Sequence, residues 1–144
     1  IRFEENDKPF LPSVNFNISH ASDSVVCALS KEGRIGIDIE KNREVELKHF
    51  ESFFTVAEWK NILESASPLQ QFYRYWTRKE SIIKALGLKL SYLNHIQLNI
   101  EVNVFEENGK RWYLRGLDFG TEYTGAICSE MELSAPVDIQ YVEL

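Results

Sequence analysis

Residues 68–104 decide the fold class of this chain, and they read PLQQFYRYWTRKESIIKALGLKLSYLNHIQLNIEVNV. In the first half of this stretch, aromatic and aliphatic side chains recur at helical spacing, with Pro68 suited to the first turn and Gly87 to the end of a helix. From Ile96 to Val104 the period changes, because apolar residues alternate with polar ones as they do in a strand. A helix followed by strands predicts an α+β protein.

The segments on either side extend this pattern. Asn108-Gly109 suits a tight hairpin turn. Strands are predicted over further apolar or alternating segments at 15–19, 25–29, 35–40, 111–115, 123–129 and 138–143. Another helix is predicted to run to about residue 65, because Thr55 and Glu58 match a capping box at its start. The predicted fold is therefore α+β, an antiparallel meander sheet packed against two or three helices.

The composition is that of a globular domain with an acidic balance. The chain has 144 residues and a formal net charge of −6, which disfavours non-specific binding to nucleic acid or to anionic membranes. No apolar run approaches the roughly 18–20 residues that a membrane helix needs, so no membrane partner is expected. Cys27 and Cys128 make neither a disulfide framework nor a zinc pattern, which predicts a cytoplasmic location.

Positive charge is concentrated in residues 70–89, where five basic residues accompany the single acid Glu80. A basic segment within an acidic chain suggests a local anion site, and the alternative is a solvated helix face. The chain also begins at Ile1 and not at a methionine. We interpret this start as the mark of a piece of a longer protein.

Two carboxylates lie side by side on the predicted strand 35–40. Asp38 and Glu40 are two residues apart, so both point to the face opposite the isoleucines. Adjacent carboxylates repel each other unless they are solvated or bridged by a cation, and Mg²⁺ accepts one or two protein carboxylates together with phosphate oxygens. The alternative is an exposed strand face that carries two acids.

Further polar residues could extend this group. Glu80 and Lys84 are four residues apart on one helix face, where they could supply a third carboxylate and a phosphate ligand, or form an ordinary surface ion pair. Ser19-His20 at a strand end could hold a phosphate, although a lone histidine is more often structural. Glu58 is explained by helix capping and could also act as a base.

Four motifs, taken together and in this order, resemble the 4′-phosphopantetheinyl transferases. They are Phe16-Asn17-Ile18-Ser19-His20, Gly36-Ile37-Asp38-Ile39-Glu40, Phe53-Phe54 with Glu58, and Trp76-x-x-Lys79-Glu80-Ser81-x-x-Lys84-x-x-Gly87. Because the Ser-His motif precedes the Asp-x-Glu motif, the chain resembles the long, two-lobed Sfp type. The resemblance extends from about Lys8 to the last predicted strand.

The resemblance implies a holo-[acyl-carrier-protein] synthase, or 4′-phosphopantetheinyl transferase, in which coenzyme A is the co-substrate. Such an enzyme moves the phosphopantetheine arm of coenzyme A to a serine of an acyl or peptidyl carrier protein and releases 3′,5′-ADP. The implied Mg²⁺ ligands are Asp38, Glu40 and Glu80. The implied coenzyme A contacts are Lys8, Pro9, Ser19, His20, Lys79 and Lys84. The implied catalytic groups are Lys84, which steadies charge on the leaving side, and Glu80 or less readily Glu58, which removes the serine proton.

The chain departs from the two-lobed pattern in two ways. Ala21 stands where the family often has a second serine. Most of the first lobe is also absent, so we expect residues 1–33 to be its tail and residues 34–144 to be the second lobe. A partner lobe or a homo-oligomer could complete the site, and the alternative function is a non-catalytic module that binds coenzyme A or a carrier protein. Docking is expected to use an apolar patch and the basic segment, and the carrier could serve fatty acid, polyketide, nonribosomal peptide or lysine synthesis.

Overall fold

The computed structural model describes residues 2–3, 9–10 and 12–133. The strands are β1 (Arg2–Phe3), β2 (Pro9–Phe10), β3 (Asn15–Ala21), β4 (Ser24–Ser30), β5 (Ile35–Lys41), β6 (Val104–Glu107), β7 (Lys110–Asp118) and β8 (Tyr123–Ser129). The α-helices are α1 (Val56–Glu64) and α2 (Pro68–Leu86), and the 3-10 helices are η1 (Leu47–Phe53) and η2 (Leu90–His95). Strands, helices and then strands again confirm the predicted α+β class.

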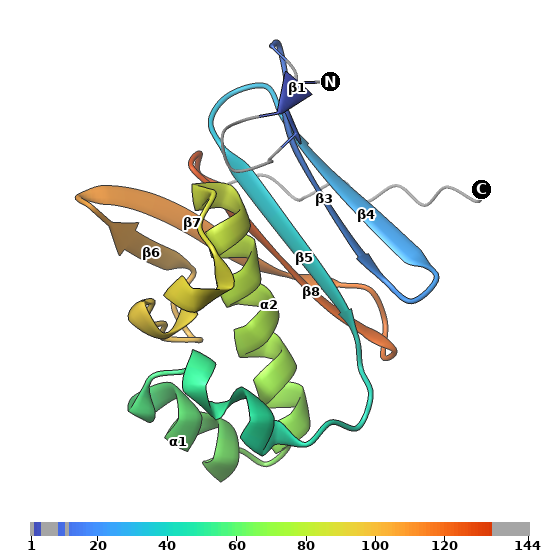
Figure 1. Ribbon diagram of the computed structural model, residues 1–144, viewed down its shortest axis with the longest axis vertical. Coiled ribbons are helices and arrows are strands. Elements are labelled where there is room, and N and C mark those ends of the chain that lie inside the picture. The colour runs from blue at the N-terminus through green and yellow to red at the C-terminus, as the bar shows by residue number, and fades with distance from the viewer. Residues whose placement is uncertain (1, 4–8, 11, 134–144) are drawn as a thin grey trace.

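The largest sheet among the described strands is antiparallel, in the order β5-β8-β7-β6. Strands β6, β7 and β8 form the predicted meander, and Asn108 and Gly109 make the β6–β7 turn with φ angles of 52° and 73°. Strand β5 pairs with β8, placing Ile37 opposite Ile127, and is therefore an edge strand of this sheet. Strands β3 and β4 form a separate hairpin that lies beside β5 (Figure 1).

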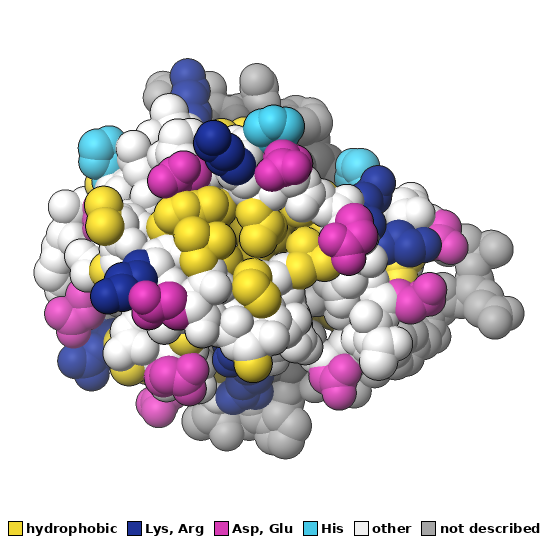
Figure 2. Space-filling model, turned by 90° about the horizontal axis from the view of Figure 1, so that it is seen from below, with side chains coloured by type: hydrophobic (Ala, Val, Ile, Leu, Met, Phe, Trp, Pro, Cys, Tyr) yellow, Lys and Arg dark blue, Asp and Glu magenta, His cyan; other side chains and the backbone are white. Residues whose placement is uncertain are grey.

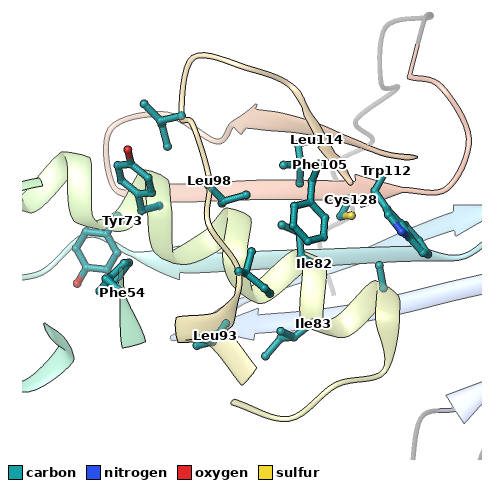
Figure 3. Packing of buried hydrophobic residues seen from close by; sticks show 14 of the residues in the cluster. Phe54, Tyr73, Ile82, Ile83, Leu93, Leu98, Phe105, Trp112, Leu114 and Cys128 are labelled. Atoms are coloured by element: carbon teal, nitrogen blue, oxygen red, sulfur yellow. The ribbon is translucent and has the colours of Figure 1, made fainter. Parts of the chain in front are cut away.

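Helix α2 lies across one face of this sheet and approaches β5 very closely (Figure 1). A Cβ atom at Gly36 would lie 2.1 Å from the carbonyl oxygen of Ser81 and 2.5 Å from the amide nitrogen of Ala85, so only glycine permits this approach. Figure 3 shows the main hydrophobic core, which fills the space between α2 and the sheet. Its buried members include Phe72, Ile82, Ile83, Leu93, Phe105, Trp112, Leu114 and Cys128.

Both α-helices begin and end within one residue of the predicted positions. The Thr55 side chain accepts a hydrogen bond from the N–H of Glu58, whose carboxylate accepts one from the N–H of Thr55, so the predicted capping box is confirmed. Helix α2 has Pro68 in its first turn and ends at Gly87, which has a φ angle of 71°. Glycine adopts this left-handed conformation without strain.

The predicted strand over residues 96–104 is wrong except at its last residue, where β6 begins. The alternation reflects burial in an irregular segment, whose buried residues are Ile96, Leu98 and Ile100. The N–H of Leu98 donates a hydrogen bond of 2.7 Å to a carboxylate oxygen of Glu58. At Leu98 a buried carboxylate thus accepts the hydrogen bond that a neighbouring strand would accept in a sheet. A period-two pattern cannot distinguish a strand from an irregular segment with alternating burial.

Some predictions fall on residues that are not described. Lys8 and the predicted strand over 138–143 lie outside the described residues. Pro9 lies in β2, where its backbone is opposite Phe3. Within the described part of the chain, no helix is long and apolar enough to cross a membrane.

Candidate active site

The outer edge of β5 is closed by side chains of β3. The Asn17 Oδ1 atom accepts a hydrogen bond of 2.8 Å from the N–H of Ile37, and the Ser19 Oγ atom accepts one of 3.3 Å from the N–H of Ile39. Asn17 and Ser19 alternate with exposed residues of β3 and are buried against β5. The hairpin therefore satisfies an edge that would otherwise carry unpaired amides, and it holds Ser19 next to the acidic face of β5.

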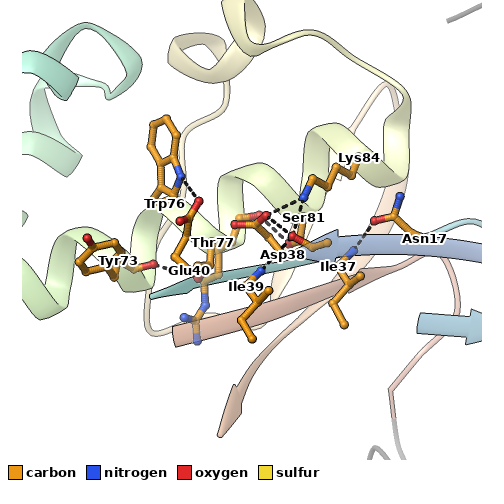
Figure 4. A network of polar contacts seen from close by, with 12 residues as sticks. Asn17, Ile37, Asp38, Ile39, Glu40, Tyr73, Trp76, Thr77, Ser81 and Lys84 are labelled. Atoms are coloured by element: carbon orange, nitrogen blue, oxygen red, sulfur yellow. Dashed lines mark hydrogen bonds and ion pairs between the residues drawn. The ribbon is translucent and has the colours of Figure 1, made fainter. Parts of the chain in front are cut away.

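Asp38 is the centre of the polar network that Figure 4 shows between β5 and α2. Its Oδ1 atom accepts hydrogen bonds from Lys84 Nζ at 2.6 Å and from Ser19 Oγ at 3.0 Å, and Lys84 Nζ also donates to Ser19 Oγ at 3.0 Å. Asp38 is only 3% exposed, so the alternative of a solvated strand face is wrong for this residue. Its Oδ2 atom is also buried and has no hydrogen-bond partner among the described residues.

Two further carboxylates come from the same face of β5 and from α2. Glu40 lies two residues after Asp38, and its Oε1 atom accepts a hydrogen bond of 3.2 Å from the indole Nε1–H of Trp76. Glu80 is half-buried on α2, one turn before Lys84. The predicted alternative of a surface pair between Glu80 and Lys84 is not the arrangement found, because Lys84 forms its ion pair with Asp38.

Burial and mutual repulsion make these carboxylates reluctant to ionise together. Burial raises the pKa of Asp38, and the ammonium of Lys84 opposes that rise. Burial and the charge of Asp38 raise the pKa of Glu40. Burial, followed by the charge of Asp38, raises the pKa of Glu80 to about 7. A bound cation would offset this repulsion and favour the ionised form of all three carboxylates.

The three carboxylates do not form a preassembled metal centre. Among the described residues, no three His, Cys, Asp or Glu side chains are grouped so that they could hold a metal ion. The donor set nevertheless fits a hard divalent cation, because Asp38 Oδ2 is buried without a partner among the described residues, and burial together with acidic neighbours raises the pKa of Glu80. Some side-chain rotation would be needed before all three carboxylates could share one ion.

Glu58 and Lys79 form a separate, fully buried ion pair. Lys79 Nζ lies 2.6 Å from Glu58 Oε2, and the two side chains are 0% and 1% exposed respectively. Glu58 also accepts hydrogen bonds from the N–H groups of Thr55 and Leu98. Neither charged group reaches solvent or a ligand in this arrangement, which favours a structural role over the expected base and phosphate contact.

Ser19 and His20 do not share one site. Successive residues of a strand point to opposite faces, so the buried Ser19 side chain faces β5 while the His20 side chain is exposed on the other face of β3. In this arrangement the two side chains therefore cannot bind the same phosphate, contrary to the expectation from the sequence.

The basic segment 70–89 does not form one positive surface. Arg78 and Lys79 are buried, with the Arg78 guanidinium close to Gly116, and Lys84 is bound to Asp38. Lys89 is exposed, while Arg74 is half-buried. The alternative of a uniformly solvated helix face is also wrong, because α2 packs against the sheet and the side chains of Arg78 and Lys79 are buried.

An open hollow of about 320 Å³ lies at the α1 end of the molecule. Figure 2 views this end and shows apolar side chains gathered at its centre with charged side chains around them. Val56 is 88% exposed and Leu63 is 51% exposed. The lining residues are Glu51, Phe54, Thr55, Val56, Trp59, Lys60, Leu63 and Glu64.

Comparison with known proteins identifies the family. Residues 34–141 match the model of the 4'-phosphopantetheinyl transferase superfamily. The chain belongs to this superfamily. It is 42% identical over 92 residues to the 4'-phosphopantetheinyl transferase gsp of Aneurinibacillus migulanus, a match that covers 60% of this chain and 38% of that protein. It is 34% identical over 138 residues to a 4'-phosphopantetheinyl transferase of Bacillus subtilis, covering 88% of this chain and 61% of that protein.

The chain is also similar to a vertebrate protein. The match is to the L-aminoadipate-semialdehyde dehydrogenase-phosphopantetheinyl transferase of Xenopus laevis, with 36% identity over 122 residues, 72% of this chain and 40% of that protein. The chain thus spans between 38% and 61% of the length of these three relatives. The family match begins at residue 34, and the division into lobes stays a prediction.

Two residues of the site in this phosphopantetheinyl transferase superfamily member, Asn17 and Trp76, could not be recognised from the sequence as residues that contact β5. The sequence indicates no role for Asn17, and the helical spacing of Trp76 indicates a core aromatic residue. Gly36 gave a usable signal, since a glycine within an isoleucine-rich strand suggests close approach of another backbone. The partners of Asn17 and Trp76 lie on other elements, so no local spacing indicates them.

Proposed function

We propose that this chain is the catalytic part of a Mg²⁺-dependent 4′-phosphopantetheinyl transferase. It would take the phosphopantetheine arm from coenzyme A to a serine of a carrier protein and release 3′,5′-ADP. The observation that carries the proposal is the buried carboxylate face of β5. There Asp38 has an oxygen without a hydrogen-bond partner among the described residues, is paired with Lys84 through its other oxygen, and is near enough for its charge to raise the pKa of Glu80. Family membership supports the same chemistry.

The proposed cation ligands are Asp38, Glu40 and Glu80. When bound there, Mg²⁺ would neutralise part of the charge of the coenzyme A pyrophosphate. Ser19 holds one oxygen of Asp38, which leaves the other free to face a ligand. Most of the catalytic effect expected in phosphoryl transfer comes from positioning and charge neutralisation, which these side chains supply.

Lys84 and Glu80 have complementary proposed roles. The Lys84 side chain is 28% exposed, so its ammonium can reach phosphate oxygens at the mouth of the site while remaining near Asp38. Glu80, on the side of the site facing Asp38 and Glu40, would receive the proton of the carrier serine, directly or through water. The serine oxygen then bonds to the phosphorus that carries the pantetheine arm, and the bond from that phosphorus to the 3′,5′-ADP oxygen breaks.

We propose that Glu58 and Lys79 stabilise the fold and do not contact coenzyme A. Their buried ion pair joins α1 to α2, and the Glu58 carboxylate also holds the backbone at Leu98. The nucleotide end of coenzyme A would then rely on residues around the β3–β4 hairpin, for which His20, Lys8 and Pro9 remain candidates.

The proposed acceptor is a folded acyl or peptidyl carrier protein, whose docking requires an exposed surface. The apolar hollow on α1 is one surface of the kind expected from the sequence, with Val56 and Leu63 exposed within it. Its charged rim contains both acidic and basic groups, so the apolar centre would supply most of the contact area. Further first-lobe residues, in the same or another chain, would complete the proposed coenzyme A site.

The direct test mixes the chain with coenzyme A, Mg²⁺ and an apo carrier protein, and looks by mass spectrometry for the added phosphopantetheine arm. Asp38→Asn and Glu80→Gln should each abolish transfer while the far-ultraviolet circular dichroism spectrum is kept. Glu106→Gln is the matched control, because Glu106 pairs with Arg111 in an exposed position on β6 and should not matter. Wild-type turnover in both site variants would overturn the proposal, and coenzyme A binding without any transfer would favour the non-catalytic module.

A further inference from the structure

The indole of Trp76 contacts a proposed metal ligand, although the proposed reaction gives Trp76 no role. Trp76 lies on α2, and its Nε1–H donates a hydrogen bond of 3.2 Å to Glu40 Oε1 on β5, as Figure 4 shows. The bond crosses between two elements, so it restricts the rotation of the Glu40 side chain. It also occupies one carboxylate oxygen and leaves the other for a ligand.

The orientation of the indole is itself determined by aromatic packing. The ring of Phe72 stacks on Trp76 with centroids 5.8 Å apart and an interplanar angle of 26°. Phe50 and Phe53 of η1 contact it edge-on, at 5.3 and 5.5 Å with angles of 80° and 79°. Rings on several sides leave the indole little freedom to rotate, so the N–H has a fixed direction toward Glu40.

Asp38 is arranged in the same way. Its Oδ1 atom is held by Lys84 and Ser19, and its Oδ2 atom is left without a partner. Each acid of β5 therefore has a protein donor on one oxygen. Hydrogen bonds of this kind orient metal-ligating carboxylates and typically contribute about 10- to 100-fold to metal affinity.

We propose that Trp76 is a positioning residue of the divalent-cation site, where its indole N–H orients Glu40 so that the other carboxylate oxygen can bind the ion. The inference rests on the proposed function, because it assumes that Glu40 is a ligand. It assigns to Trp76 a role beyond aromatic packing, because packing of the ring does not require the N–H group.

The first experiment measures Mn²⁺ binding to the whole chain, without coenzyme A, from the electron paramagnetic resonance signal of the free ion. Trp76→Phe keeps an aromatic ring among Phe50, Phe53 and Phe72 but removes the N–H, and it should weaken Mn²⁺ binding by about 10- to 100-fold. The matched control is Trp112→Phe, because the Trp112 Nε1 atom is buried without a hydrogen-bond partner among the described residues. That control should bind Mn²⁺ like the wild type.

The second experiment observes the indole N–H groups themselves in a ¹H–¹⁵N spectrum, where the three tryptophans of the chain give separate signals. The Trp76 signal should move when Mg²⁺ is added and when Glu40 is changed by Glu40→Gln, while the Trp112 signal should stay in place. This arm remains informative even if Trp76→Phe unfolds the protein.

The outcomes separate the two hypotheses. If the wild type binds Mn²⁺ and Trp76→Phe binds it equally well, or if the Trp76 signal ignores Glu40→Gln, the positioning role is refuted and the metal site stands. If the wild type itself binds no Mn²⁺, the metal site of the proposed function is refuted and the positioning role is refuted with it.

Discussion

The close contact between β5 and α2 makes Gly36→Ala the most informative single substitution. The added Cβ atom would lie 2.1 Å from the Ser81 carbonyl oxygen, whereas real Cβ atoms essentially never come within 3.0 Å of another atom. The contacted atoms at Ser81 and Ala85 belong to the helix backbone and cannot rotate away. Helix α2 must therefore retreat from β5 by about 1 Å, the difference between these two distances.

This displacement has separate consequences for stability and for activity. Overpacking of this kind costs about 1–3 kcal/mol in the free energy of unfolding, which at roughly 2–4 °C per kcal/mol lowers the melting temperature by about 2–12 °C. The ion pair of 2.6 Å between Lys84 and Asp38 joins the two elements that move apart. A misplacement of about 1 Å at a reacting centre can cost about 100-fold in rate, so transfer should fall by that order in a protein that is still folded.

The assay combines thermal unfolding, followed by circular dichroism, with transfer to an apo carrier protein, followed by mass spectrometry. The matched control is Gly116→Ala on β7, where the Cβ atom would lie 3.0 Å from the flexible guanidinium of Arg78 and not against backbone. This control should melt and turn over almost like the wild type. The reasoning is refuted if Gly36→Ala keeps both the wild-type melting temperature and the wild-type rate.

Three further predictions concern the buried polar groups. Lys79→Met leaves Glu58 charged and unpaired in the interior, so it should lower the free energy of unfolding in urea by about 3–5 kcal/mol; an unchanged urea midpoint would contradict a structural ion pair. The raised pKa of Glu80 means that the folded protein binds more protons than the unfolded chain between pH 4.5 and about 7, so stability should fall as the pH rises through this window. Glu80→Gln should flatten that slope in urea unfolding at several pH values, and an equal slope in this variant would show that other groups cause it. Asn17→Ala removes the acceptor for the N–H of Ile37 and should cost about 1–3 kcal/mol, with faster hydrogen exchange at that amide, whereas full protection of the amide would exclude the proposed edge contact.

The secondary structure could be predicted wherever the signal is local. The capping box at Thr55 and Glu58, the left-handed Gly87 and the turn at Asn108-Gly109 each depend on residues within one turn of the chain, and each is found in the structure. The alternation of Ile35 to Glu40 also correctly placed isoleucines on one face and acids on the other. Residues 96–103 were mispredicted because period two reports alternating burial, whether or not a partner strand is present.

The partners of charged residues could not be predicted, because they depend on which faces become buried. Glu80 and Lys84 have the spacing of a helical ion pair, but Lys84 reaches across to Asp38, whose carboxylate is more deeply buried than that of Glu80 and therefore offers a stronger interaction. Lys79 and Glu58 belong to different helices, and packing α1 against α2 brings them together. The charge count of residues 70–89 suggested a local anion site, but the fold buries Arg78 and Lys79 of this segment.

The sequence by itself determined the family, the α+β class, the boundaries of both helices and the acids that are proposed as cation ligands. These properties follow from periodicity, capping residues and motif order, all of which can be read along the chain. Only the tertiary structure decided which oxygen of Asp38 is free, that Trp76 holds Glu40, and that Glu58 and Lys79 are buried together. The physical reason is that each contact joins residues on different elements. The contacts of Asp38 and Glu40 need α2 to pack directly on β5 at Gly36, and the Glu58–Lys79 pair needs α1 to pack on α2.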